Sequence, residues 1–464
     1  MATKAAPKAR RGGACRAAHA AWWCLSISGC VAPTLPAPRV GVVGAPEDKP
    51  IRFIEDDYAG ALAIARARRL PLFVDAWAPW CHTCLSMRSY VLSDAALRPL
   101  REQFVWLAID TEREGNAGVV SKLGVRALPT LYVIEPTNEK PILAWPGSLT
   151  ANELAVLLED SAASVRQGDE GGAASSALLR GYRASAGGMA KEAIAAYRQA
   201  LAAAPPDWPR RPQSVDALVA QLADDRQLGA CVETGLEEAP KMPAGTALAD
   251  VLRAAIGCAE ELPAGAPGRG RLGDLAALGH HAASDRTQPI LADDRSDLYD
   301  FVIGAYRELG QDDEVKGIAA EWAAFLEEQA GRAQSPAARA VFDAHRVLAY
   351  KALGEPQRSV PMLEESERDF PADYNPPARL ASTYLAMKRN DEALAAVKRA
   401  LEKAYGPRKL RLWSLEADAY EAMGNGPAAR EALRAALDFA KTVSLTAGYA
   451  KLRDSIEKRL NEPR

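Results

Sequence analysis

Apolar residues follow two different periods in the first part of the chain. Short apolar runs at 51–54, 71–78 and 104–111, and a pair of runs between 129 and 147, have the length of β-strands. The segments between them repeat apolar residues every three to four positions, as amphipathic helices do, and another helical segment follows at 151–165. The predicted order is β-α-β-α-β-α-β-β-α, which is typical of an α/β domain with a central sheet and helices on both faces.

The rest of the chain is rich in Ala and Leu, and its helical pattern contains an internal repeat. Ala193 is followed by an aromatic residue, a small residue and a proline at 4, 7 and 12 positions further on. The spacing of the first three positions returns at Ser359, Ala393 and Ala429, which are 34 and 36 residues apart, and a tyrosine stands nine residues before each. Small residues at such intervals let paired helices pack closely, and the pattern resembles tetratricopeptide repeats.

The two patterns divide the chain into an α/β part and an all-α part. We expect the α/β domain over 51–166, degenerate helical repeats over 175–262 and tetratricopeptide-like helix pairs over 296–460. The Pro- and Gly-rich stretch at 261–275 marks an irregularity or a boundary between two sub-arrays. Stacked helix pairs form a concave surface that binds peptides or proteins, or that serves as a spacer or a dimerisation surface.

Residues 1–29 have the features of a secretion signal. They hold five basic residues and no acidic residue, and a short, mostly apolar stretch ending in small residues follows the basic head. The sequence ISGC, which ends at Cys30, resembles the lipobox of bacterial lipoproteins, in which the cysteine is acylated and becomes the mature N-terminus. The alternatives are a plain secretion signal or an artefact of an upstream start site. Residues 30–50 are rich in Pro, Ala and Gly and are expected to form a flexible tether.

The composition fits a globular protein of two or three domains. The 464 residues are 48% hydrophobic and 25% charged, and no stretch approaches the ~20 apolar residues that a membrane-spanning helix needs. The formal charge is -3, and without residues 1–29 the chain has 52 basic and 60 acidic residues, a net charge of -8. This balance argues against nucleic acid as a partner. Contact with a membrane is expected only through a lipid on Cys30.

Cys81 and Cys84 stand two residues apart, directly after a strand-like run and at the head of a helix-like run. A cysteine at a helix N-terminus meets unpaired backbone N–H groups and the positive end of the helix dipole, so the pKa of Cys81 is expected below the ~8.5 of a free thiol. Cys81 is therefore the predicted attacking sulfur. Cys84, one turn along the same face, is the predicted resolving thiol. Asp75 closes an apolar strand, where burial should raise its pKa.

Residue spacing argues against metal or haem binding by these cysteines. Zinc needs two further thiolate or imidazole ligands, and neither His280–His281 nor His345 has a ligand pattern around it, so no metal site is predicted. Haem attachment needs a histidine after the second cysteine, where Leu85 stands. Cys231 and Cys258 lie in a helical region and form either a disulfide or part of the apolar core.

Four motifs in the right order resemble the thioredoxin family. They are VDAWAPWCHTC at 74–84, LAID at 107–110, VRALPT at 125–130 and Gly147 after the last strand. Their spacing and the segment MRSYVLSD look closest to the periplasmic C-terminal domain of the transmembrane thiol:disulfide interchange reductases. The resemblance covers about a quarter of the chain and implies a thioredoxin-like fold for that part.

The resemblance assigns roles to residues around the cysteines. Asp75 would accept the proton of Cys84, the alternative being a solvated aspartate at a strand end. Pro129 would follow a cis peptide bond, which leaves the backbone of Leu128 and Thr130 bare for an extended substrate segment, unless it is an edge proline. Trp80 would shield the thiols and offer an apolar contact to the substrate, unless it only packs.

His82 departs from the Gly-Pro dipeptide that thioredoxins commonly have between the two cysteines. A protonated imidazole would add positive charge near Cys81 and favour its thiolate. The departure leaves the redox poise of the pair open.

These features together predict a thiol:disulfide oxidoreductase that reduces protein disulfides in the bacterial cell envelope, facing the periplasm and anchored by lipid. No cofactor is expected. The expected partners are disulfide-bearing client proteins, an upstream electron donor and a protein or peptide on the repeat array. The alternative is a protein-binding scaffold that uses its thioredoxin-like domain for docking. A docking domain has no need of Cys81, Cys84, Asp75 and Pro129 together, which favours the enzyme.

Overall fold

The computed structural model describes residues 50–167 and 172–462. The predicted signal segment, the lipobox Cys30 and the tether up to residue 49 lie outside the described residues. The described residues belong to one compact unit, in which the α/β domain and the helical array are in contact. None of the helices within the described ranges is both long enough and apolar enough to cross a membrane.

The α/β domain is built on one mixed sheet of five strands in the order β1-β3-β2-β4-β5. The strands are β1 (Ile54–Glu55), β2 (Leu72–Trp77), β3 (Val105–Asp110), β4 (Thr130–Glu135) and β5 (Lys140–Pro146). β1, β3 and β2 are parallel, whereas β4 and β5 run antiparallel to their neighbours. The predicted hairpin of β4 and β5 and the predicted α/β fold are confirmed.

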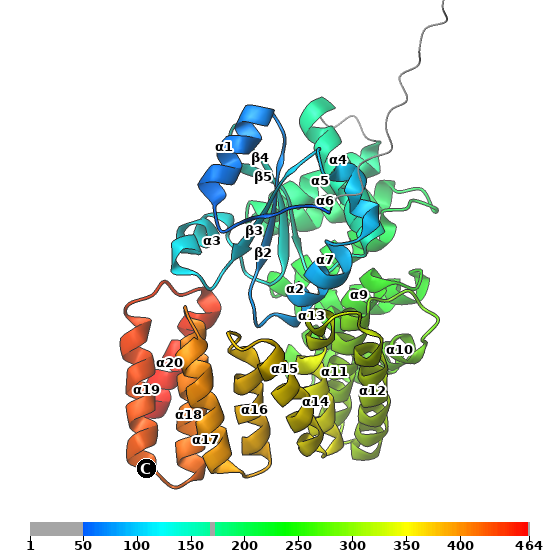
Figure 1. The fold of residues 1–464 in the computed structure, drawn as a ribbon. Helices are drawn as coiled ribbons and strands as arrows, with labels where there is room; N and C mark the ends of the chain where they lie inside the picture. The colour runs from blue at the N-terminus through cyan, green and yellow to red at the C-terminus, as the bar shows by residue number, and fades with distance from the viewer. Residues whose placement is uncertain (1–49, 168–171, 463–464) are drawn as a thin grey trace, which may run out of the picture. The chain divides into compact units, whose positions relative to one another are not determined.

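Helices cover both faces of this sheet, because the central strands are apolar at consecutive positions. Leu72 and Val74 pack with α1 (Tyr58–Arg68) and α3 (Ala117–Leu123) on one face. Phe73 points to the other face and packs with α4 (Ala151–Gln167) and with the π-turn Met87–Val91. That turn follows α2 (His82–Ser86), the short helix that carries Cys84, and a 3₁₀ segment (Ala95–Leu100) continues the connection to β3. Figure 1 shows α1 and α3 on one side of the strands.

The rest of the described chain is a tetratricopeptide-like array of helices. In chain order they are α5 (Ala173–Ala186), α6 (Ala190–Ala203), α7 (Arg211–Asp224), α8 (Leu228–Glu238), α9 (Thr246–Glu261), α10 (Leu272–Ser284), α11 (Ala292–Glu308), α12 (Asp312–Arg332), α13 (Pro336–Ala340), α14 (Asp343–Leu353), α15 (Ser359–Asp369), α16 (Asn375–Ala386), α17 (Asn390–Lys403), α18 (Arg408–Ala422), α19 (Gly426–Ala440) and α20 (Ala447–Asn461). The interruption expected at 261–275 is the connection between α9 and α10.

The repeat positions found in the sequence lie at the packed faces of helix pairs. Ala193, Ala393 and Ala429 are each fully buried. In the first pair, the backbone of α5 at Gly181 contacts the ring of Tyr197 on α6, because a Cβ at Gly181 would lie only 2.3 Å from this ring. The small residues therefore have the structural role that the spacing predicted.

Cys231 and Cys258, for which the sequence left two alternatives, are joined in a disulfide between α8 and α9. Their Cα atoms are 6.3 Å apart, within the range of ordinary disulfides. The bond cross-links α8 to α9.

Candidate functional site

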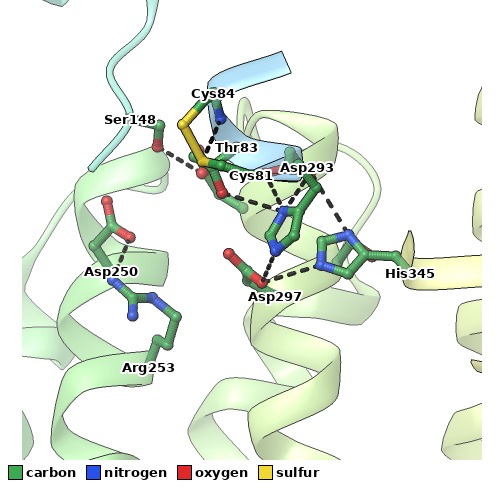
Figure 2. A network of polar contacts seen from close by, with 12 residues as sticks. Cys81, Thr83, Cys84, Ser148, Asp250, Arg253, Asp293, Asp297 and His345 are labelled. Carbon is green, nitrogen blue, oxygen red and sulfur yellow. Dashed lines mark hydrogen bonds and ion pairs between the residues drawn. A yellow bond between two sulfur atoms is a disulfide. The ribbon is translucent and has the colours of Figure 1, made fainter. Parts of the chain in front are cut away.

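The cysteine pair lies where the central strand β2 ends and α2 begins. Cys81 is the N-cap of α2 and is joined to Cys84 in a disulfide, with the Cα atoms 5.2 Å apart (Figure 2). The backbone N–H of Cys84 donates to the sulfur of Cys81 over 3.1 Å. In the reduced protein the same N–H group would favour a thiolate at Cys81 over a thiol.

Asp75 is buried on β2, with 1% of its surface exposed. It lies three residues before Ala78, where the loop from β2 to α2 begins. Neither carboxyl oxygen has a hydrogen-bond partner, and the nearest charge is the Arg88 guanidinium, 3.7 Å away. Burial raises the pKa of Asp75 to about 7, because the attraction of Arg88 only partly offsets the loss of hydration and Glu55 repels the carboxylate. A carboxyl with this pKa can take up and release a proton near neutral pH.

The Leu128–Pro129 peptide bond is cis, as the resemblance implied. β4 begins at the next residue, and Thr130 pairs with Ala76 at the end of β2, which brings the proline to the edge of the sheet where the cysteines lie. Leu128 packs directly against the cluster that contains Cys81 and Cys84. The hydroxyl of Thr130 donates to the carbonyl of Ala127 over 2.7 Å, so its side chain stabilises the turn.

Trp80 packs against the cluster that contains Cys81 and Cys84, as expected of a residue that shields the thiols, and it also contacts the array. Its indole N–H donates to Oε1 of Glu112 over 2.8 Å, and the guanidinium of Arg408 lies 4.9 Å from the ring centroid. Glu112 also accepts the hydroxyl of Tyr449 on α20 (2.8 Å) and the backbone N–H of Arg408 on α18 (2.9 Å). The residue expected to contact a substrate is thus in contact with α18 and is linked to α20 through Glu112.

Further contacts bring the array against the face of the sheet domain that carries the cysteines. Asn375 on α16 donates to the carbonyl of Pro79 over 3.0 Å, and the hydroxyl of Ser148 donates to Asp294 on α11 over 2.5 Å. A Cβ at Gly406 would lie 1.9 Å from the carbonyl oxygen of Glu112, so only glycine permits this approach. Cys81, on the face that the array contacts, has 5% of its surface exposed.

His82 also faces the array, where it meets three side chains that the sequence did not connect with it. Its Nδ1 lies 3.1 Å from Oδ2 of Asp293, and its Nε2 lies 3.7 Å from Oδ1 of Asp297, both on α11. The imidazole of His345, at the start of α14, lies 4.0 Å from the His82 ring, centroid to centroid. Burial lowers the pKa of His82, but the two carboxylates outweigh it and raise the pKa to about 9.

The sequence contained one hint of this cluster. The run DDRSD at 293–297 places two aspartates four residues apart, hence on one face of a helix. Nothing in the spacing along the chain could show that this face meets His82, which is 211 residues away from Asp293. The prediction of no metal site rested on such spacing alone.

A mixed sheet with Cys-x-x-Cys at the end of its central strand and a cis proline beside the pair defines a thioredoxin-like domain, here followed by a tetratricopeptide-like array. The family model described as thioredoxin-like matches residues 53–136. Thioredoxin 1 of Synechococcus elongatus is 32% identical over 87 residues, which are 18% of this chain and 78% of that protein. Thioredoxin C-3 of Corynebacterium nephridii is 29% identical over 106 residues, which are 23% of this chain and 66% of that protein. The chain belongs to the thioredoxin family.

Solved structures match the helical part. A tetratricopeptide repeat protein from Parabacteroides merdae aligns over 62% of this chain and 100% of its own length, with a TM-score of 0.40 and 11% identity. The tetratricopeptide protein TTC0263 of Thermus thermophilus aligns over 53% of this chain and 98% of its own length, with a TM-score of 0.25 and 19% identity.

Proposed function

We propose that this protein is a thiol:disulfide oxidoreductase that reduces disulfides of client proteins at the bacterial cell envelope. The observation that carries the proposal is the Cys81–Cys84 disulfide at the start of α2. The cis bond before Pro129 lies beside it, and the buried Asp75 is on β2, the strand that leads to the pair. A chain that only docks partners has no use for this set of groups.

The reduced protein would act in two exchange steps. The Cys81 thiolate attacks one sulfur of the client disulfide, which forms a mixed disulfide and releases the other client sulfur as a thiolate. Cys84 then loses its proton to Asp75 and attacks the sulfur of Cys81. This step breaks the mixed disulfide, releases the second client thiolate and leaves the Cys81–Cys84 disulfide. Two electrons have passed to the client, and an upstream dithiol donor must restore the reduced pair.

The envelope location rests on the lipobox-like sequence before Cys30 and on the second disulfide. Cys231 and Cys258 are bonded within the array, and structural disulfides of this kind belong to oxidising compartments such as the bacterial periplasm. Acylation of Cys30 would hold the protein at a membrane with the thiol domain facing the periplasm. Intact-mass analysis of the membrane fraction tests the acylation. An unmodified Cys30, or a protein that still carries residues 1–29, would contradict it.

A second candidate function is a protein-binding scaffold. The contacts of the array with the face that carries the thiols favour it. Pro79 accepts a hydrogen bond from Asn375, the Arg408 guanidinium lies over the ring of Trp80, and Cys81 is almost wholly buried. If the protein is an oxidoreductase, the same contacts instead limit which clients reach Cys81, and the array selects the partners.

The discriminating experiment follows disulfide exchange by the full chain. The reduced protein is mixed with a disulfide-bonded peptide, and products are followed by mass. We expect the wild type to reduce one disulfide per chain, Cys84→Ser to stop at a mixed disulfide on Cys81, and Cys81→Ser to be inert. Cys231→Ala/Cys258→Ala is the matched control and should retain exchange. Equal exchange by Cys81→Ser and the wild type would rule out the oxidoreductase and leave the scaffold.

A further inference from the structure

Four side chains from three helices form a closed ring beside the cysteine pair. Asp293 and Asp297 lie on α11, His345 on α14, and His82 follows Cys81 at the start of α2. One imidazole nitrogen of each histidine, both of them Nδ1, faces Asp293, and the two Nε2 atoms face Asp297. Figure 2 shows Asp293, Asp297 and His345 converging from the array towards the helix of the cysteines.

His345 is the member of the ring whose bonding is incomplete. It is buried, with 1% of its side chain exposed, and its Nε2 lies 3.1 Å from Oδ1 of Asp297, which can accept the Nε2–H proton. In the neutral ring that proton leaves a lone pair on Nδ1. This Nδ1 has no hydrogen-bond partner, and the atom it faces is Oδ1 of Asp293, 3.6 Å away. Two acceptors facing each other in a buried site repel unless a cation lies between them.

Further carboxyl groups lie close to the ring. Asp294, next in the chain to Asp293, is buried as well, and its Oδ2 has no hydrogen-bond partner. Arg253 also lies nearby, where it is paired with Asp250 at 3.3 Å. A divalent ion bound to His82 would take the place of the proton that Asp293 and Asp297 favour on its imidazole, and its charge would balance these two carboxylates.

We propose that His82, His345 and Asp293 bind a divalent first-row transition metal of the Zn²⁺ type. Imidazole nitrogen and carboxylate oxygen are the ligands that suit such ions. The three ligand atoms lie within 4.8 Å of one another, and a tetrahedral zinc ion with bonds of ~2.0 Å needs them ~3.3 Å apart, a small adjustment of side chains. The fourth position is left for water, with the Thr83 hydroxyl 3.2 Å from Nδ1 of His82.

Asp297 would act on the metal through the histidines. A carboxylate that accepts the outer N–H of a metal-binding imidazole fixes the tautomer and the orientation of the ring, and Asp297 has this relation to His345. The bound ion would also fasten the helix of Cys81 and Cys84 to α11 and α14. The metal site does not depend on the proposed redox function, because none of its ligands takes part in thiol–disulfide exchange.

The test measures Zn²⁺ binding by the full chain in its oxidised form. The protein is stripped with a chelator, its free thiols are alkylated, and binding is measured by competition with a zinc-sensitive dye and by metal analysis after gel filtration. We expect one Zn²⁺ per chain. His82→Ala and His345→Gln should each weaken binding by more than about 100-fold, and Asp297→Asn by about 10- to 100-fold, the usual effect of an outer partner.

Two controls make the result specific. His280→Ala should bind Zn²⁺ like the wild type, because His280 forms a comparable pair with Glu321 (3.1 Å) outside the ring. Cys81→Ser/Cys84→Ser should also bind normally, which excludes the thiols as ligands. His82 is the least buried member of the ring, so His82→Ala reports on binding even if His345→Gln unfolds the chain. No bound zinc in the wild type, unchanged binding in His82→Ala, or loss in the cysteine variant would each overturn the proposal.

Discussion

The side-chain amide of Asn375 donates a hydrogen bond to the carbonyl oxygen of Pro79, 3.0 Å away, although the two residues are 296 positions apart in the chain. Pro79 belongs to the loop between β2 and Cys81, and Asn375 is the first residue of α16. The array therefore holds the backbone that leads into the redox pair, at the face where a thioredoxin-like domain would take an extended substrate.

Removing this bond should make Cys81 more accessible to large reagents. In a Cys84→Ser background, we expect Asn375→Ala to raise the alkylation rate of Cys81 by a polymer-linked maleimide, relative to a small maleimide, by up to about tenfold. One hydrogen bond contributes ~0.5–1.5 kcal/mol to the closed arrangement. The control is Asn390→Ala, which removes a similar bond to the carbonyl of Ala422 (2.9 Å) far from the loop. An equal ratio in Asn375→Ala and its control would show that this bond does not limit access.

Glu112 should be important for the docking of the array, because it is buried and accepts hydrogen bonds from Trp80, Tyr449 and the backbone of Arg408. Glu112→Ala leaves these donors without an acceptor, at ~1–3 kcal/mol for each one that stays buried. We expect a clearly lowered midpoint of thermal unfolding, measured by circular dichroism. Glu114→Ala, which removes an exposed contact with Ser444, should change the midpoint little. Similar effects of the two variants would contradict this role.

Asp75 should make stability fall as the pH rises. Its pKa is about 7 in the folded protein, raised from 3.8, so between these values the folded state keeps a proton that the unfolded state has lost. By linkage, its contribution to the free energy of unfolding is complete below pH 3.8 and is lost as the pH rises through 7. The difference of about three units corresponds to ~4 kcal/mol.

Asp75→Asn removes this titration. We expect the variant to gain stability over the wild type progressively from about pH 4 to about pH 7 and by a constant amount above, as measured by urea unfolding at a series of pH values. Asp160→Asn, which neutralises a half-exposed carboxylate of α4 paired with Arg210, is the control for a general charge effect. A stability difference between Asp75→Asn and the wild type that does not change with pH would mean that Asp75 is ionised in the folded protein throughout this range.

The disulfide between Cys231 and Cys258 should stabilise the array without affecting exchange at Cys81. It closes a segment with a sequence separation of 27 residues, and loops of this size gain ~2–4 kcal/mol from the cross-link. Cys231→Ala/Cys258→Ala is expected to lose free energy of unfolding in that range while peptide-disulfide exchange keeps its rate. A loss of exchange in a variant that is still folded would show that the second pair takes part in electron transfer.

The sequence by itself determined the features that depend on near neighbours. Period-two and period-3.6 patterns predicted the sheet and the helix pairs, because each element must bury its own apolar face. Cys81 and Cys84 could be picked out because their chemistry depends on positions within one short loop, and Pro129 could be picked out from the family resemblance. The strand position of Asp75 likewise predicted its burial and the direction of its pKa shift.

Only the tertiary structure decided what faces these residues. Trp80 was expected at a substrate surface, yet its indole is bonded to Glu112 and covered by Arg408. The ring around His82 and His345 joins segments that share no local pattern, because it depends on the packing of α11 on α2. The bonding of Cys231 to Cys258 likewise depends on contacts between distant parts of the chain. Such contacts arise from the summed packing of whole helices, and no spacing of residues along the chain records them.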